Sequence, residues 1–390
     1  MGNPLQSPFR GVTVLDLSQG IAGPYCTAIL AEQGARVIKV EPPGGDWSRR
    51  MGAAFGNQTT TYTTFNVGKQ SICIDAGNPE GAALIRQLAV NCDLVVQNFR
   101  PGVVERLGLD YARLAAEVPG ILYISISGFG SEGPEARRPA TDSVMQASTG
   151  LMHLNADGGV PRKIPLPIAD IATAIYAAQA AAAALYRRAI SGQSGHIEIS
   201  LLQACAAVQA WPIIESHAHP DLAGLAPSAP NGVFATADGH ISLSCLDDAM
   251  FARICQALGM PQWASNQIWN TPAGRLQDIA ELNHSVEQIT RTRLTAHWTA
   301  ALRQHDVLHS PVRTLADFLT APQTQATGIF ATLTQPGYGS YSFPHHPLGD
   351  LQQLGPAPGC GAQSAEVLLA AGLTAAEIDR LLVAGIIQGS

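Results

Sequence analysis

The chain has 390 residues, a formal net charge of −7 and 14% charged residues. This acidic balance, without any basic run, argues against nucleic acid as a partner, and the length predicts two domains. Seven cysteines, an odd number with no C-x-x-C pair, favour reduced thiols over a disulfide framework. The first ten residues lack the apolar stretch of a signal peptide, so we expect a cytoplasmic protein.

Short apolar runs alternate with helical patterns from residue 10 to about residue 130. Runs of strand length separated by amphipathic stretches predict a parallel α/β sheet with right-handed crossovers. The predicted strands are VTVLDLS (12–18), RVIKVE (36–41), SICIDA (71–76), LVVQNF (94–99) and ILYISISGFG (121–130), and the predicted helices are 22–33, 79–91 and 111–118.

The first strand runs into a glycine turn, and the second ends in the acid Glu41. Dinucleotide-binding folds begin in this way, with phosphate at the helix N-terminus. The glycines, however, read Gly20-x-x-Gly23 instead of G-x-G-x-x-G. The pattern leaves open a dinucleotide site, a site for another ligand that approaches the glycine backbone closely, and a tight βαβ turn.

An alanine-rich helix is predicted over 170–190, before another strand at 196–202. Its apolar run of 16 residues (171–186) is too short to span a membrane and indicates a buried helix. Asp170, at the junction of a proline-containing loop and this helix, reads as an N-cap. The same position suits a nucleophilic carboxylate that the helix dipole keeps ionised. Asp142 opens another helical pattern and also reads as an N-cap, or as a second carboxylate that orients or repels substrate groups.

The pattern changes at about residue 215, where ESHAHPDLAGLAPSAPN reads as an irregular linker. GVFATADGHISLSC (232–245) then predicts a hairpin that turns at Asp238-Gly239. Helices are predicted around 248–258, 275–291 and 295–304, and a closing pair at 364–371 and 374–384.

Basic residues are sparse, and several follow predicted strands, where α/β sheets bind their ligands. Each is a candidate phosphate contact or, individually, a solvated surface charge. These residues are Lys39, Arg49, Lys69, Arg100, Arg106, Arg137 and Arg138. The eleven histidines show no ligand spacing, so no metal site is expected.

Taken together, the segments resemble class III CoA-transferases, the family that contains formyl-CoA transferase and carnitine CoA-transferase. The match runs in order along nearly the whole chain. Its segments are AGPYCTAILAEQGARVIKVEPPGGDWSR, FNVGKQSICID, NPEG, VVQNFRPGVVERLGL, ISISGFGSEGP, RPATDSVMQASTGLM, PIADIATAIYA, GVFATADGHISL and LTAAEIDRLLVAGII.

The resemblance implies an α/β fold: a Rossmann-like large domain with a parallel sheet, plus a smaller α+β domain, in an interlocked-ring homodimer. We therefore expect the first part of the large domain at 1–215, the small domain at 225–320, and a return segment at 330–390 that completes the large domain. The segments around 205–225 and 320–345 would carry the threading of the rings.

The resemblance also implies coenzyme A or acyl-CoA as substrate, no permanently bound cofactor, and a small, possibly dicarboxylic, acid as co-substrate. Neither nucleic acid nor membrane is expected as a partner. The family's nucleophilic aspartate corresponds to Asp170, and the implied route passes through mixed anhydrides and an aspartyl-CoA thioester. The CoA-contacting positions of the family correspond to Gln19, Gly20, Ile21, Ala22, Ile74, Asn98, Phe99 and Arg106.

Two departures from the family pattern matter. Pro42 stands where some members have a basic residue, which leaves the phosphate contacts open, and the glycine-rich loop of formyl-CoA transferase is not evident; SAPNGVFATADG occupies its approximate place. The alternative function is a 2-methylacyl-CoA racemase of the same family, but Thr141 stands where those enzymes have a histidine base. A CoA-binding protein without turnover and, from the first strand alone, a NAD-dependent dehydrogenase are the remaining alternatives.

Overall fold

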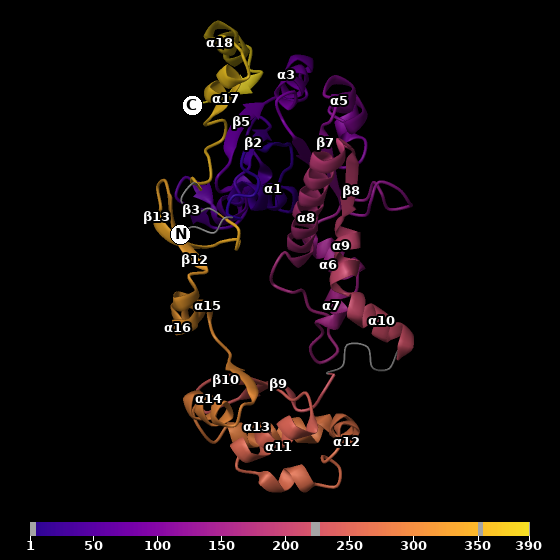
Figure 1. Ribbon diagram of the computed structural model, residues 1–390, viewed down its shortest axis with the longest axis vertical. Helices are drawn as coiled ribbons and strands as arrows, with labels where there is room; N and C mark the ends of the chain where they lie inside the picture. Colours follow the sequence, from indigo (N-terminus) through magenta and orange to yellow (C-terminus); the bar gives the residue numbers. More distant parts are fainter. Residues whose placement is uncertain (1–4, 220–226, 350–353, 390) are drawn as a thin grey trace. The chain divides into compact units, whose positions relative to one another are not determined.

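The computed structural model describes residues 5–219, 227–349 and 354–389, and the chain divides into two compact units (Figure 1). Unit 1 comprises Met1–Ile214 and Gly328–Ser390, and unit 2 comprises Glu215–Thr327. Unit 1 is therefore assembled from two stretches of sequence that the whole of unit 2 separates.

Unit 1 is built on a seven-stranded sheet with the order β14-β5-β2-β1-β6-β7-β8. Six strands run parallel, and β14 pairs antiparallel with β5. The predicted α/β class with a parallel sheet is confirmed. The strands are β1 (Thr13–Asp16), β2 (Arg36–Glu41), β5 (Gln70–Ile74), β6 (Leu94–Gln97), β7 (Leu122–Ser127), β8 (His196–Ser200) and β14 (Ile387–Gln388).

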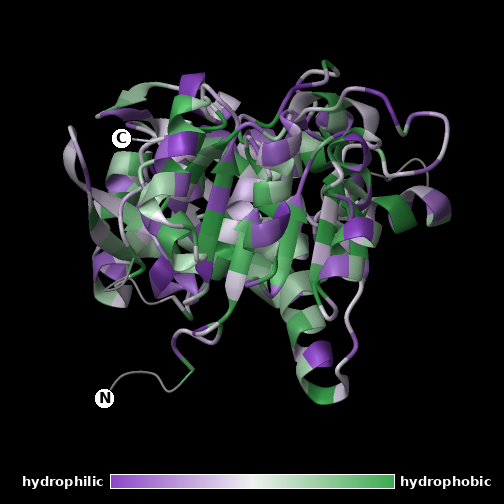
Figure 2. Ribbon diagram, turned by 90° about the horizontal axis from the view of Figure 1, so that it is seen from above, coloured by the Kyte–Doolittle hydropathy of each residue, from purple (hydrophilic) through white to green (hydrophobic). Residues whose placement is uncertain are grey.

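Both faces of this sheet are buried, as parallel sheets require. Alternate residues enter opposite cores: Val14 faces one core and Leu15 the other. Figure 2 shows the strands as largely hydrophobic ribbons enclosed by helices. The first core is covered by α1 (Ala22–Glu32), α6 (Asp142–Ser148), α7 (Leu151–Leu154), α8 (Ile168–Ser191) and α9 (Leu201–Val208), and the second by α3 (Pro79–Ala89), α4 (Val103–Leu107), α5 (Tyr111–Glu117), α17 (Ser364–Ala370) and α18 (Ala375–Val383).

Helix α8 has 24 residues and extends the predicted helix of 170–190 by two residues at its start and one at its end. By length and composition it is the one helix among the described residues that could cross a membrane. Its contacts favour a core role, because α8 packs on α1 and the side chains of Ala174, Ala177 and Ala181 are fully buried. One face of α8 is therefore part of the core of unit 1.

The remaining elements of unit 1 connect these layers. The segment between β2 and β5 holds η1 (Trp47–Arg50), β3 (Ala54–Phe55), β4 (Gln58–Thr59) and α2 (Thr60–Asn66), and the return segment holds the hairpin β12 (Phe330–Gln335) and β13 (Gly339–Pro344). Helix α10 (Ala210–Ala218) extends into the predicted irregular linker, so that prediction is wrong for its first residues. Residues 220–226 of the linker lie outside the described ranges.

Unit 2 carries a three-stranded antiparallel sheet of β9 (Asn231–Ala235), β10 (His240–Ser244) and β11 (Leu308–Pro311). The predicted hairpin is confirmed by the pairing of β9 with β10. Its core contains residues of α11 (Asp248–Ala257), α13 (Ile279–Thr290) and α14 (Thr295–Gln304), and shorter helices are η3 (Pro261–Ser265), α12 (Pro272–Gln277), α15 (Leu315–Thr320) and α16 (Pro322–Thr327).

Candidate active site

The sheet order places a ligand crevice between β1 and β6. Strands β2 and β5 lie on one side of β1, and β6, β7 and β8 lie on its other side. The connection that follows β1 and the connection that follows β6 therefore run in opposite directions across the sheet. Such switch points at the carboxyl ends of parallel strands are where α/β proteins bind ligands. The loops after β1 and β6 are joined there by Gln19 and Asn98: the Gln19 N–H donates to Asn98 Oδ1 (2.8 Å), and Asn98 Nδ2 donates to the Gln19 carbonyl (2.7 Å).

The two glycines of the opening motif, Gly20 and Gly23, leave room for side chains from other parts of the same chain. Gly20 has φ +82°, and a Cβ there would lie 2.1 Å from Cζ2 of Trp47. A Cβ on Gly23 would lie 2.3 Å from the Cβ of Ser18. Trp47 and Ser18 therefore fill the spaces that side chains at these two positions would occupy, which favours the tight turn among the three alternatives; the approach of a ligand to this backbone stays a prediction. The glycines set the path of the loop that carries Gln19, Ile21 and Ala22.

A cavity of about 360 Å³ opens at this crevice. Its walls come from the segments that follow five of the parallel strands (β1, β2, β6, β7 and β8), and Asp170 lies on one side of it. The lining includes Gln19, Ile21, Ala22, Trp47, Asn98, Phe99, Arg100, Ser127, Gly128, Arg138, Thr141, Asp170 and Leu201. The structure thus brings six of the predicted site residues together around one space.

Three other predicted residues lie elsewhere. Ile74 is fully buried in the second core from β5, and Arg106 is exposed on α4; neither lines the cavity. Gly20 is covered by Trp47. In exchange, the structure shows lining residues that the sequence patterns missed. Trp47 is one of them, and its separation of 123 residues from Asp170 (170 minus 47) gave no local pattern to connect the two.

Asp170 is the third residue of α8, whose N-cap is Pro167. The N-cap alternative for Asp170 is therefore wrong. A carboxylate from another helix acts on this helix start instead: Asp142 Oδ1 accepts the N–H of Ala169 (2.9 Å). Since that donor is adjacent to Asp170, the bond fixes the first turn of α8 and with it the position of the Asp170 side chain.

Asp142 is itself the first residue of α6, and its expected role as the N-cap of that helix is taken by Thr141. Its second oxygen accepts from Gln146 Nε2 (2.8 Å) and lies 3.4 Å from Lys163 Nζ. Asp142 is buried, with both carboxylate oxygens engaged. This arrangement ties Asp142 to the first turn of α8, directly beside Asp170.

The environment of Asp170 opposes its ionisation. Burial and, to a smaller extent, the nearby Asp142 carboxylate raise the pKa of Asp170, and Lys163 lowers it; together they bring this pKa to about 7. A carboxyl group that gains and loses its proton near neutral pH, at the edge of a cavity, is typical of a reacting group. In its ionised form this carboxylate is a nucleophile with little solvation to lose.

We expect the rate of a reaction at Asp170 to rise with pH through about 7, because only the ionised form of a carboxyl group attacks a carbonyl carbon. Asp142→Asn removes a neighbouring negative charge and keeps an acceptor for the Ala169 N–H, so the midpoint of the profile should move to lower pH. Asp157→Asn, at an exposed carboxylate paired with Arg162, serves as the control and should leave the midpoint in place. A profile that Asp142→Asn does not move would contradict the assignment.

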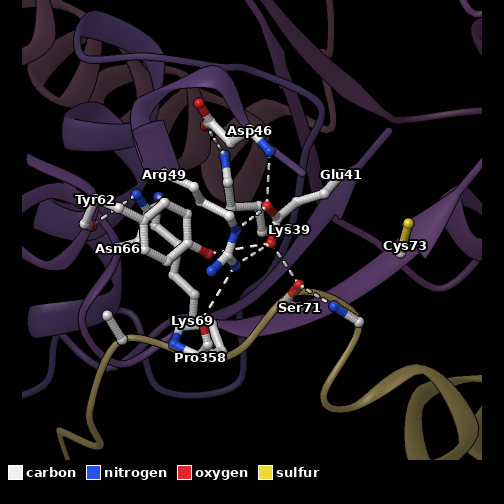
Figure 3. Close-up of polar contacts among 12 residues, drawn as sticks. Lys39, Glu41, Asp46, Arg49, Tyr62, Asn66, Lys69, Ser71, Cys73 and Pro358 are labelled. Atoms are coloured by element: carbon white, nitrogen blue, oxygen red, sulfur yellow. Dashed lines mark hydrogen bonds and ion pairs between the residues drawn. The ribbon is translucent and has the colours of Figure 1, made fainter. Parts of the chain in front are cut away.

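Three of the candidate phosphate contacts belong to a buried network of charges beneath the loop (Figure 3). Lys39 Nζ lies 2.9 Å from Asp46 Oδ2, and Lys69 Nζ lies 2.9 Å from Asp16 Oδ2. All four side chains have no exposed surface. Lys39 and Lys69 therefore cannot reach a ligand, and their expected role is wrong.

Arg49 is likewise committed to the protein. Its guanidinium forms a bidentate pair with Glu41 (both N to O distances 2.6 Å) and lies over the ring of Tyr62 (Figure 3). Burial raises the pKa of Glu41, but Arg49 and Lys39 outweigh it and leave that pKa below its ordinary value. Asp46, which accepts from the N–H of Gly20 (3.0 Å), links this network to the cavity loop. Of the candidate cations, Arg100 and Arg138 line the cavity and are exposed.

Among the described residues, no group of three or more His, Cys, Asp or Glu side chains is arranged to hold a metal ion. The lining of the cavity includes the carboxylate of Asp170, two arginines and the loop that Asn98 joins to Gln19. This set suits a large anionic ligand whose reacting end reaches Asp170.

The model of CoA-transferase family III matches residues 9–364 of the chain. The chain belongs to CoA-transferase family III. As a member of this family it is an enzyme, which confirms the resemblance seen in the sequence.

Relatives of this CoA-transferase support the same conclusion. The chain is 32% identical to succinyl-CoA:glutarate CoA-transferase of Homo sapiens, over 86% of this chain and 79% of that protein. It is 31% identical to acetyl-CoA:oxalate CoA-transferase of Acetobacter aceti, over 83% and 85%. The crystal structure of a CAIB/BAIF family protein from Brucella suis superimposes with a TM-score of 0.82 at 29% identity, covering 95% of this chain and all of that one (100%).

Proposed function

We propose that this enzyme moves CoA from an acyl-CoA to a carboxylic acid with Asp170 as the nucleophile. One observation carries the proposal: a carboxyl group with a pKa raised to about 7 borders the cavity at the switch point of the sheet. Asp170 lies in the first turn of α8, and Asp142 holds that turn by accepting the N–H of Ala169.

The proposed route uses only the carboxylate and the thiolate. Asp170 attacks the thioester carbonyl of the donor and expels CoA thiolate, which leaves a mixed anhydride. The thiolate attacks the aspartyl carbonyl, releases the donor acid and forms an aspartyl-CoA thioester. The acceptor carboxylate attacks this thioester, giving a second mixed anhydride and thiolate. The thiolate then attacks the acceptor acyl carbonyl, which yields the new acyl-CoA and restores the Asp170 carboxylate.

CoA itself is proposed to occupy the 360 Å³ cavity. Gln19, Ile21, Ala22, Asn98 and Phe99 would contact the pantetheine and adenine portions, as the resemblance implies. Arg100 and Arg138, at the same cavity, supply positive charge for the phosphates in place of Lys39 and Lys69. Three further positions would act without lining the cavity. Gly20 would set the path of the loop, Ile74 would support the sheet, and Arg106 would add positive charge at a distance.

The enzyme is further proposed to be a cytoplasmic homodimer with interlocked chains. All seven cysteines are free thiols, which suits a reducing compartment. Helix α10 has no buried residue, and its Trp211 and Ile214 are 64% and 67% exposed. Apolar surface of this kind marks an interface in a soluble protein. A sedimentation mass of one chain would count against the dimer.

The test is a transfer assay read by mass spectrometry. Succinyl-CoA and acetyl-CoA serve as donors against a panel of acids that includes glutarate, oxalate, malate and itaconate. We expect a new acyl-CoA with at least one pair, and hydroxylamine added during turnover should convert Asp170, and no other carboxylate, to a hydroxamate. Transfer without any label on Asp170 would reject the mechanism, and α-deuterium exchange without an acceptor acid would favour the racemase.

A further inference from the structure

Asp170 borders a second cavity as well as the first. This space of about 520 Å³ is lined by α2, by the loop before α8 and by Trp47, and it shares Ile21, Trp47, Thr141 and Asp170 with the proposed CoA cavity. Because the two cavities meet at the reactive carboxylate, a CoA thioester in the first would present its acyl group to the second. The second cavity is thus the place for the acid.

The chemistry of its walls is mixed. Met51, Phe65, Pro165 and Leu166 supply apolar surface that suits a short carbon chain. Thr60, Thr61 and Thr64 of α2 add hydroxyl groups on the same lining. Among the described residues of this lining, Lys163 is the one that carries a positive charge, against the carboxylates of Asp142 and Asp170.

Lys163 has charge available for a ligand. Its ammonium is 3.4 Å from Asp142 Oδ2, which is a long contact, and its side chain is 45% exposed. Asp142 already accepts from the Ala169 N–H and from Gln146, so it does not depend on Lys163 for its hydrogen bonds. An ammonium with three donors and one distant partner can bind a further carboxylate.

We propose that Lys163 determines acid specificity by binding the second carboxylate of a dicarboxylic acid, whose first carboxylate reacts at Asp170. The inference rests on the proposed function, and it assigns the distal carboxylate to a residue of this chain. An acid with two negative charges entering a cavity that already holds Asp142 and Asp170 needs such a cation. An acid with an apolar end makes no ion pair with Lys163, whose charge then keeps only Asp142 and solvent as partners.

The experiment compares glutarate with valerate, a monocarboxylic acid of the same carbon chain length, as acceptors. In double-displacement kinetics the kcat/KM of the acceptor reports only the acceptor half-reaction, so the choice of donor cancels. We expect the native enzyme to prefer glutarate. Lys163→Met should lower kcat/KM for glutarate by about 30- to 100-fold and change that for valerate by less than about threefold. Lys163→Arg should restore most of the preference.

Arg162→Met is the matched control. Arg162 precedes Lys163 in the same loop, pairs with Asp157 at the surface and does not line the cavity, so its loss should leave the preference unchanged. If Lys163 acts only through the charge of Asp170, Lys163→Met will affect both acids equally and move the pH profile, and the inference fails. Absence of transfer to any acid by the native enzyme would instead reject the proposed function.

Discussion

Asp170→Asn is expected to lower the rate of CoA transfer by at least about 10⁴-fold while the folded protein becomes more stable. An amide has the shape of the carboxylate but cannot attack a thioester, so no aspartyl intermediate forms. The rate is measured with a saturating donor and acceptor, and the intermediate by hydroxylamine labelling. An enzyme that keeps more than about a tenth of its rate would exclude Asp170 as the nucleophile.

The stability of the same variant separates a reacting group from a structural one. Burial raises the pKa of folded Asp170 above its value in the unfolded chain, so ionisation of this group costs stability as pH rises from about 4 to about 7. Asparagine removes that cost. After allowance for solvent in the cavity, we expect roughly 1–2 kcal/mol of added stability at pH 8 and little change at pH 4. Asp157→Asn should change neither rate nor stability.

Lys69→Met is expected to lower the free energy of unfolding by about 3–5 kcal/mol at neutral pH. Lys69 Nζ pairs with Asp16 Oδ2 at 2.9 Å and donates to the carbonyl of Pro24 and to Asn66, all without exposed surface. Burial by itself raises the pKa of Asp16, but Lys69 and Lys39 outweigh it and hold that pKa well below its usual range. Methionine fills the space and leaves the carboxylate buried with less compensation.

Urea denaturation measures this effect, and two variants frame it. Arg113→Met breaks the exposed pair with Glu117 on α5 and should cost less than about 0.5 kcal/mol. Combining Lys69→Met with Asp16→Asn removes both charges and should recover at least half of the loss, because the uncompensated carboxylate is gone. A cost below about 1 kcal/mol for Lys69→Met alone would mean that the pair is solvated.

The sheet could be predicted from the sequence because its information is local. Each of the six parallel strands is a short apolar run, and runs such as RVIKVE (36–41) coincide with the observed β2. Strand β14 could not be found in this way. It has two residues, Ile387 and Gln388, and exists because β5 offers an unpaired edge far away in the sequence.

The site was predictable where a resemblance or a helix start marks it, as at Asp170. The site was not predictable where burial determines whether a basic side chain can reach the cavity. By sequence, Lys39 and Lys69 belong with Arg100 and Arg138 to the basic residues near predicted strands. The two lysines, however, form buried ion pairs with Asp46 and Asp16 inside the protein. Similarly, the sequence around Asp170 resembles an N-cap, but the group that acts on that helix start, Asp142, comes from another helix.

Strand β14 has a consequence for folding during synthesis of the chain on the ribosome. It closes the edge of the sheet beside β5, and Ile386 and Ile387 belong to the core that α17 and α18 cover. Residues 1–214 therefore emerge from the ribosome with the edge of β5 unpaired. This edge can pair with β14 only after unit 2 and the return segment have been synthesised. An open edge over that interval invites pairing with other chains. The edge of β5 thus stays open to such pairing between the synthesis of β5 and that of β14.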